Sequence, residues 1–164
     1  MNERQANKRP IAAKRSAARL AAVQALYQMD LAHTDLNDVI EEFSDGRLSS
    51  DMDGAEFNDV DLAFFRDILS GVVREQKTLD PLLDNQLAIG WRLARIDSIL
   101  RAILRSGAYE LQYRSDIPAK VVINEYVDVA HAFFVKDEPR VVNGVLDHLA
   151  KTLRADELDQ TGNE

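Results

Sequence analysis

The stretch from Ala102 to Ala130, AILRSGAYELQYRSDIPAKVVINEYVDVA, decides the fold class, because it reads as two amphipathic helices joined by a short break. Apolar or small residues recur at helical spacing on both sides of the break: Ile103, Gly107 and Leu111 before it, and Val122, Tyr126 and Val129 after it. The break is SDIP, residues 115–118. Its proline has no N–H for a helical hydrogen bond and disfavours a helical conformation at the preceding residue. A mid-helix glycine costs about 1 kcal/mol relative to alanine, so Gly107 predicts close packing of another backbone.

The remainder of the chain continues this pattern. Proline and glycine are scarce and no strand-like alternation is sustained, so we expect an all-α protein of about seven helices. The expected helices cover residues 15–31, 35–43, 60–77, 80–89, 94–113, 119–133 and 137–153, with an acidic loop at 44–59. Asp80-Pro81 is typical of a helix start. We expect a flexible basic arm at 1–14, one helical domain at 15–154, and a fraying polar tail at 155–164.

Composition narrows the class of protein. A chain of 164 residues fits one domain with a substantial core. No apolar run approaches the length of about 18 to 20 residues that spans a bilayer, and no secretory signal follows the basic start. The chain has no cysteine, which excludes disulfides and thiol chemistry. These features are compatible with the cytoplasm.

Charge is distributed unevenly along the chain. The net charge is −8, yet residues 1–19 carry six basic residues against one glutamate, a local net of +5. Arg15 and Arg19 lie four residues apart, at the N-terminal end of the first expected helix, and Arg9 and Lys14 lie just upstream. Helix N-termini and arginines both favour phosphate, so the pattern predicts an RNA-binding site. The alternative is a solvated tail that aids solubility.

Residues for catalysis or for metal binding are not placed in any known pattern. His33, His131 and His148 are unpaired at helical spacing, and there is no nucleophile motif or glycine-rich phosphate loop. The segment that begins at Asp51 fails the calcium-loop pattern, because Glu56 and Leu62 stand where that pattern needs Gly and Glu. We therefore predict no enzyme activity, no cofactor and no metal.

Three segments together resemble the NusB family of bacterial transcription antitermination factors. They are ARLAAVQALYQ at 18–28, the stretch at 102–130 quoted above, and VVNGVLDHLA at 141–150. The resemblance covers nearly the whole chain in order and is weakest between about 35 and 58. It implies an all-helical fold of seven helices in two packed bundles, without enzyme activity.

The resemblance also implies partners. Members of the family pair with the ribosomal protein NusE, and the pair binds the boxA element of nascent single-stranded RNA. Binding helps RNA polymerase to read through terminators, notably in ribosomal RNA operons. Some members dimerise, so a homodimer stays open. The resemblance does not give the RNA preference or the affinity of this chain.

The RNA contacts that the resemblance implies come from two places. The arginine-rich start corresponds to Arg15 and Arg19 with Lys14, while Ser16 and Ala17 replace two basic positions and Arg9 compensates from the arm. In the loop that opens the last helix, an acidic position, a basic position and a frequent aromatic position are matched by Asp137, Arg140 and Val141. Valine cannot stack on a base as an aromatic ring does.

Two residues are candidates for a protein-partner surface. Tyr27 matches the tyrosine of the AxQALY motif, which the resemblance places at the surface facing NusE; core packing is an equal alternative. Phe64 lies off the apolar stripe of its expected helix, which consists of Leu62, Phe65, Leu69 and Val72. We expect Phe64 to be exposed and to bind a partner.

Two other functions remain open. The chain could be a helical adaptor that binds proteins and never touches RNA. It could also be the NusB-like domain of an RNA cytosine methyltransferase, which predicts a following α/β domain with a glycine-rich cofactor loop. Residues up to Glu164 contain no such domain.

Overall fold

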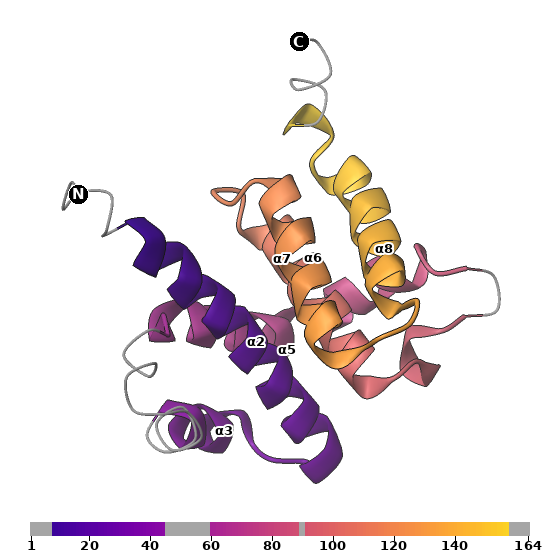
Figure 1. The fold of residues 1–164 in the computed structure, drawn as a ribbon. Helices are drawn as coiled ribbons and strands as arrows, with labels where there is room; N and C mark the ends of the chain where they lie inside the picture. The colour runs from indigo at the N-terminus through magenta and orange to yellow at the C-terminus, as the bar shows by residue number, and fades with distance from the viewer. Residues whose placement is uncertain (1–7, 45–59, 89–90, 158–164) are drawn as a thin grey trace. The chain divides into compact units, whose positions relative to one another are not determined.

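The computed structural model describes residues 8–44, 60–88 and 91–157, and all regular structure in these ranges is helical (Figure 1). This confirms the prediction of an all-α protein. The chain divides into two compact units, residues 1–73 and 74–164, in agreement with two helical bundles. The elements are α2 (Lys8–Ala32), α3 (Leu36–Glu42), α5 (Leu62–Asp84), the 3-10 helix η3 (Leu93–Arg95), α6 (Ser98–Tyr113), α7 (Ala119–Phe133) and α8 (Glu138–Leu153). None of the helices in the described ranges is long and apolar enough to cross a membrane.

In the first unit, α2 begins earlier than the sequence predicts. It starts at Lys8 instead of Arg15, so residues 8–14, expected in a disordered arm, are helical. Alanine-rich sequence favours the extension, and Pro10 lies in the first turn, where its missing N–H is tolerated. The acidic loop predicted at 44–59 lies outside the described residues except for Ser44.

The core of this unit joins α2 and α3 to the start of α5. The face of α2 that packs inward is made mostly of small residues, and Val39 of α3 is fully buried. The rings of Phe43 and Phe65 stack with centroids 5.7 Å apart. Small side chains let neighbouring elements approach closely, so the alanines shape this core as well as favouring the helix.

Helix α5 passes through Pro81 without ending, and the predicted helix start at Asp80-Pro81 is wrong. An internal proline costs about 3 kcal/mol or more. Burial of Leu79 and Leu83 on either side of Pro81 offsets this cost. Arg105 of α6 also pairs with Asp80 through two hydrogen bonds of 2.8 Å. Tertiary packing therefore overrides the local signal.

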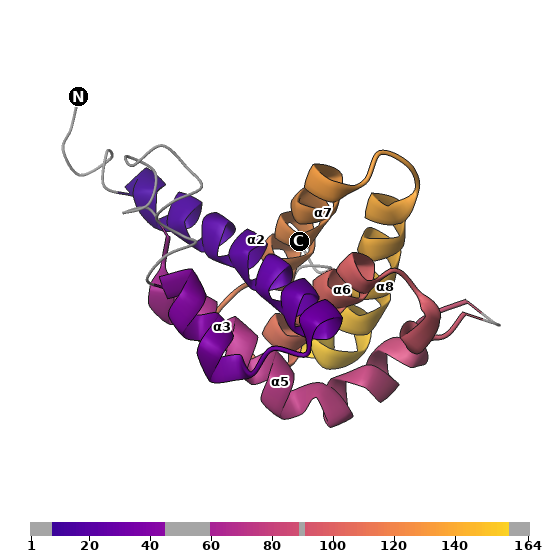
Figure 2. The same cartoon turned by 90° about the horizontal axis from the view of Figure 1, so that it is seen from below.

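The second unit is built on α6, α7 and α8, which pack against one another (Figure 2). A Cβ atom added to Gly107 of α6 would lie 2.7 Å from Cδ1 of Leu146 of α8. The prediction of another backbone at Gly107 is wrong: the close neighbour is the buried side chain of Leu146. Between α6 and α7, the hydroxyl of Tyr126 donates a hydrogen bond to the buried carboxylate of Glu110.

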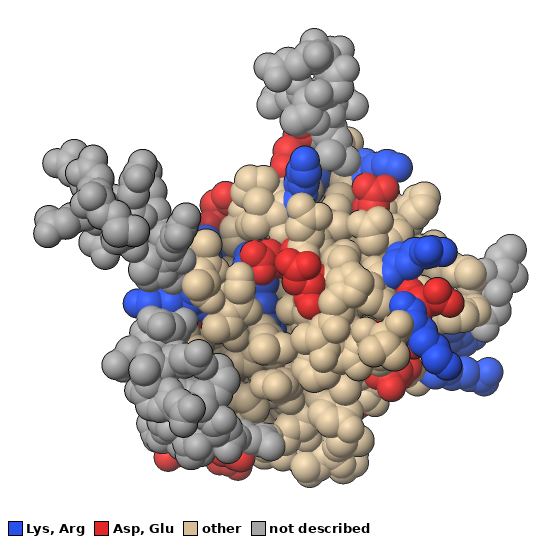
Figure 3. Space-filling model, viewed as in Figure 1, with Lys and Arg blue, Asp and Glu red and all other residues tan. Residues whose placement is uncertain are grey.

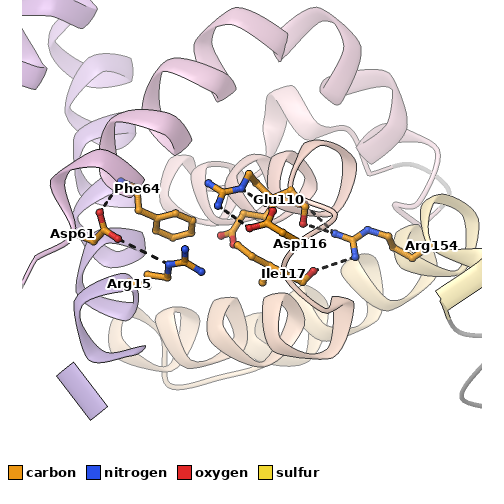
Figure 4. Close-up of polar contacts among 8 residues, drawn as sticks. Arg15, Asp61, Phe64, Glu110, Asp116, Ile117 and Arg154 are labelled. Carbon is orange, nitrogen blue, oxygen red and sulfur yellow. Dashed lines mark hydrogen bonds and ion pairs between the residues drawn. The ribbon is translucent and has the colours of Figure 1, made fainter. Parts of the chain in front are cut away.

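The C-terminal end of α6 is capped by a side chain from the end of α8. The guanidinium of Arg154 is buried and donates to the carbonyls of Glu110, Leu111 and Arg114 at 3.2, 2.7 and 2.8 Å. It also donates to the carbonyl of Ile117, at 3.1 Å, in the turn before α7 (Figure 4). The carbonyl of Glu110 also accepts from the N–H of Arg114, and that of Arg114 from the N–H of Ile117. Arg154 therefore adds a second bond to these two carbonyls and supplies a donor to the carbonyls of Leu111 and Ile117.

Glu157 completes this network. Its carboxylate accepts from Arg154 at 2.6 Å and from the backbone N–H of Ala119, the first residue of α7, at 2.8 Å. Burial raises the pKa of Glu157, but the hydrogen bonds from Ala119 and Arg154 outweigh it and lower the pKa below its usual 4.5. Residues 155–157 therefore have defined contacts, and the prediction of a tail that frays directly after Arg154 is wrong.

We expect Arg154→Met to lower the free energy of unfolding by about 2 to 5 kcal/mol, because it removes hydrogen bonds to four carbonyls and the ion-pair partner of Glu157. Chemical denaturation at pH 7 measures the loss. Lys151→Met is the matched control: Lys151 is exposed on the same helix and pairs only at the surface, so its loss should stay within about 0.5 kcal/mol. Equal losses in the two variants would contradict a structural role for the Arg154 network.

Gly107 and Gly144, both inside helices, provide a second test. Gly144 has no atom within 4 Å of an added Cβ, so Gly144→Ala should stabilise the protein by about 0.5 to 1 kcal/mol. Gly107→Ala gains the same helix propensity but must displace Leu146, at a cost of about 1 to 3 kcal/mol. Thermal melts should rank Gly144→Ala above Gly107→Ala. The reverse order would refute the tight α6–α8 packing.

Glu157 makes part of the stability depend on pH. Its folded pKa is lowered, so the native state binds its proton less readily than the unfolded state does. The stabilisation is therefore present above the unfolded pKa and is lost as the pH falls through the folded pKa. Denaturation at pH 7, 5, 4 and 3 should show Glu157→Gln losing stability at pH 7 and converging on the wild type at acid pH. Asp156→Asn, at an exposed neighbour, is the control. A difference that does not change with pH would contradict the network.

Candidate nucleic-acid interface

The first cluster of interest surrounds Phe64 at the start of α5. Asp61 precedes this helix, and its Oδ1 accepts from the N–H of Phe64 at 3.0 Å. The N–H of Asp61 donates to the carbonyl of Lys14 of α2 at 3.2 Å, which fixes the two helices together. Asp61 is thus the capping side chain of α5.

Two arginines of α2 lie over the ring of Phe64. The guanidinium carbons of Arg15 and Arg19 are 5.0 and 4.9 Å from its centroid, a cation–π distance. Figure 4 shows Arg15 beside the ring. Phe64 is consequently only 3% exposed, and the expectation of an exposed Phe64 is wrong. The reason is that the buried face of α5 includes Phe64 and Ile68, whereas Leu62, expected in the stripe, is 38% exposed. The guanidinium groups of Arg15 and Arg19 lie over the ring.

The two arginines differ in access to solvent. The Arg15 side chain is 35% exposed, whereas Arg19 is 2% exposed, so the Arg19 guanidinium does not lie on the surface that RNA would meet. Because α2 begins at Lys8, both arginines also lie inside the helix and not at its N-terminus. The expected contribution of the free N–H groups of a helix end does not apply to them.

Arg15 is weakly engaged. Its Nε is 3.9 Å from Oδ2 of Asp61, and the side chain of Asp61 is itself partly exposed. The Nε atom is buried and makes no hydrogen bond within the described part of the chain. An exposed ion pair contributes about 0 to 1 kcal/mol, so a phosphate oxygen could take the place of Asp61 at small cost.

The other predicted residues of the first unit are placed less decisively. Lys14 is half-buried on α2, and Arg9 lies near the start of the same helix. Tyr27 is half-buried on α2. That exposure fits both a partner contact and core packing, so its role stays a prediction.

The second cluster is a hollow of about 560 Å³ at the start of α8. Asp137 and Val141, both predicted from the loop that opens this helix, line it, and Arg140 beside them is exposed. The segment that leads into α6 supplies much of the remaining wall: Trp91, Arg92, Arg95, Ile96 and Asp97. Leu100, Lys136 and Glu138 complete it.

Sequence reasoning misses Trp91, which is 53% exposed. The available signal is modest. Trp91 is the chain's single tryptophan, Arg92 follows it directly, and Arg95 lies four residues after it. Among the described residues, no cluster of three or more His, Cys, Asp or Glu could hold a metal ion. The two clusters thus offer cations, aromatic surface and carboxylate acceptors, a set suited to binding.

Comparison with known proteins identifies the family. The model of the NusB family matches residues 16–151, which is most of the chain. The chain belongs to the NusB family.

Close relatives support this assignment. A protein of Bradyrhizobium sp. (strain BTAi1 / ATCC BAA-1182), named transcription antitermination protein NusB, is 56% identical over 157 residues, which cover 96% of this chain and 89% of the relative. A protein of the same name from Rhodopseudomonas palustris (strain HaA2) is 57% identical over 145 residues, covering 88% and 86%. These relatives are named for a role in transcription and not for a reaction, which confirms the prediction of a protein that is not an enzyme.

Solved structures of NusB proteins share the fold. NusB of T. maritima superposes with a TM-score of 0.70 at 29% identity, over 84% of this chain and 90% of that one. A chain from a crystal structure of antitermination factors NusB and NusE in complex with double-stranded RNA superposes at 0.69 with 23% identity, over 85% and 97%. These similarities confirm the helical architecture.

Proposed function

We propose that this protein is a transcription antitermination factor that binds boxA-like single-stranded RNA together with the ribosomal protein NusE. The observation that carries the proposal is the near full-length identity of about 55% to proteins named for antitermination. In this proposal the complex acts on nascent RNA in the cytoplasm. There it helps RNA polymerase to read through terminators, especially in ribosomal RNA operons.

The geometry supports a modest RNA site that a partner strengthens. The side chain of Arg15 is 35% exposed and its ion pair is long, and Arg140 is exposed beside the hollow. The acidic body, with a net charge of −8, limits RNA contact to these basic positions. It also favours a basic protein partner. We propose Lys14, Arg9, Arg140, Asp137 and Val141 as further RNA contacts and Tyr27 as a NusE contact.

Two alternatives are less favoured. The NusB-like domain of a methyltransferase would match relatives named for methyl transfer, whereas the first relatives are named for antitermination. A protein-binding adaptor without RNA affinity would leave Arg15 only its contact with Phe64 and its long ion pair with Asp61. Whether the free protein is a homodimer is a separate question that sedimentation would answer.

Fluorescence anisotropy with a boxA-like RNA and a scrambled RNA, each with and without NusE, tests the proposal. We expect boxA to bind more tightly and NusE to tighten binding further. Arg15→Ala should weaken binding and reduce the slope of log K against log salt by about 0.7, the value for one phosphate of a single strand.

The control for this experiment is Arg66→Ala, which removes an exposed arginine of α5 from the same unit. It should leave both affinity and salt slope unchanged. If neither RNA binds in the presence of NusE, the antitermination proposal fails and the adaptor takes its place.

A further inference from the structure

The hollow at the start of α8 combines three kinds of surface. Trp91 provides an exposed aromatic ring, and Ile96, Leu100 and Val141 provide apolar walls. Arg92, Arg95 and Lys136 are exposed cations on its rim. Figure 3 shows lysine and arginine side chains on the side of the molecule where the loop after α5 and the start of α8 lie. Aromatic surface beside cations is the combination that single-stranded nucleic acid requires.

The segment that carries Trp91 is held in place by backbone contacts. The N–H of Trp91 donates to the carbonyl of Ala88 at 2.9 Å. Two residues later, the N–H of the buried Leu93 donates to Oδ1 of Asp84 at 2.8 Å. The guanidinium of Arg101 donates to the carbonyls of Leu93 and Ala94, at 3.4 and 3.2 Å. A large ring is thus exposed on a fixed turn, which reduces the entropy lost when a ligand stacks on it.

The three carboxylates that line the hollow differ in the hydrogen bonds that they accept. Asp97 caps α6, since its Oδ1 accepts from the N–H groups of Ile99 and Leu100. Asp137 precedes the first residue of α8, and its side chain makes no capping hydrogen bond to that helix. Oε2 of Glu138 is buried and accepts no hydrogen bond from any described residue. A buried acceptor without a donor is costly, so a ligand that brings an N–H group would be favoured there.

We propose that this hollow binds one unstacked nucleobase of the RNA, with Trp91 stacking on its face and Glu138 accepting from its exocyclic amino group. Arg92, Arg95 and Lys136 neutralise the flanking phosphates. Amino groups belong to adenine, cytosine and guanine, so uracil is disfavoured at this position. Trp91 thereby supplies the stacking surface that Val141, in the same hollow, does not. The inference rests on the proposed RNA-binding function.

The arrangement of charges suits a base with flanking phosphates. The three cations lie on the rim, and a basic ribosomal partner would meet them there, whereas the carboxylates of Asp97, Asp137 and Glu138 also line the hollow and can accept from a base. A nucleic acid strand meets the cations as counter-charges. One aromatic ring, Trp91, and the apolar side chains of Ile96, Leu100 and Val141 form the walls, and such surfaces suit a planar base.

The single tryptophan makes the test direct. Titrating the wild-type protein, in the presence of NusE, with the boxA-like RNA should quench Trp91 emission in parallel with the rise in anisotropy. Replacing RNA positions one at a time by abasic sites should identify the base, because one substitution abolishes the quenching. Stacking predicts that Trp91→Ala weakens binding about five-fold to a hundred-fold and that Trp91→Phe restores most of the affinity.

Further variants separate stacking from folding and from charge. Tyr113→Ala, at another exposed ring, should leave RNA affinity unchanged. Glu138→Ala should reduce the discrimination against uracil at the identified position while retaining the quenching. Circular dichroism and thermal melts establish that each variant is folded.

The outcomes distinguish the two proposals. If the wild type binds boxA-like RNA but its fluorescence is unchanged and Trp91→Ala binds equally well, the base site is refuted and the antitermination proposal stands. If the wild type binds no RNA even with NusE, both fail. Quenching that only one abasic substitution removes, with loss of affinity in Trp91→Ala and rescue by Trp91→Phe, establishes the site.

Discussion

The buried guanidinium of Arg154 is the interaction on which the second unit depends. It satisfies the last carbonyls of α6, while Glu157 compensates its charge and binds the first N–H of α7. Buried charges are tolerated only when they are paired and fully hydrogen-bonded, and this network meets both conditions. It fixes the C-terminal end of α8 against α6 and α7. Helix α8 is about 24 Å long, and the hollow lies at its start. The Arg154 network therefore helps to position the hollow by fixing the opposite end of α8.

The two candidate RNA contacts use different physics. Arg15 is a point charge whose partner Asp61 is weak and partly exposed, so it suits a phosphate and carries no sequence information. The hollow offers a ring, apolar walls and carboxylate oxygens, which respond to the identity of a base. A protein with both kinds of contact on an acidic body can bind weakly to many strands and well to a few.

Much of the fold follows from sequence, because helix formation here agrees with hydrophobic spacing. The stripes of α6 and α7 are buried as predicted, and Gly107 marks a tight approach, which is made by the side chain of Leu146. The errors occur where tertiary contacts override local signals. Pro81 lies inside α5 because burial on either side offsets its cost, and Glu157 has defined contacts because Arg154 requires a counter-ion.

The candidate site is less predictable than the fold. A phosphate-binding arginine and a structural one have the same side chain, and only exposure separates Arg15 from Arg19. By its spacing Phe64 does not belong to the predicted apolar stripe, yet the guanidinium groups of those arginines cover its ring. Trp91 joins Asp137 through folding, since more than forty residues separate them along the chain.

The Arg154 cap also has a consequence for synthesis. It serves carbonyls that precede it by 40 to 44 residues, so α6 leaves the ribosome well before its cap is made. At about 5 to 20 residues per second, this interval lasts roughly 2 to 8 s. During that time the end of α6 must remain in water or with a chaperone. The Arg154 network can therefore form only once the end of α8 has emerged, and substitutions at Arg154 should reduce the yield of folded protein in cells more than its stability alone implies.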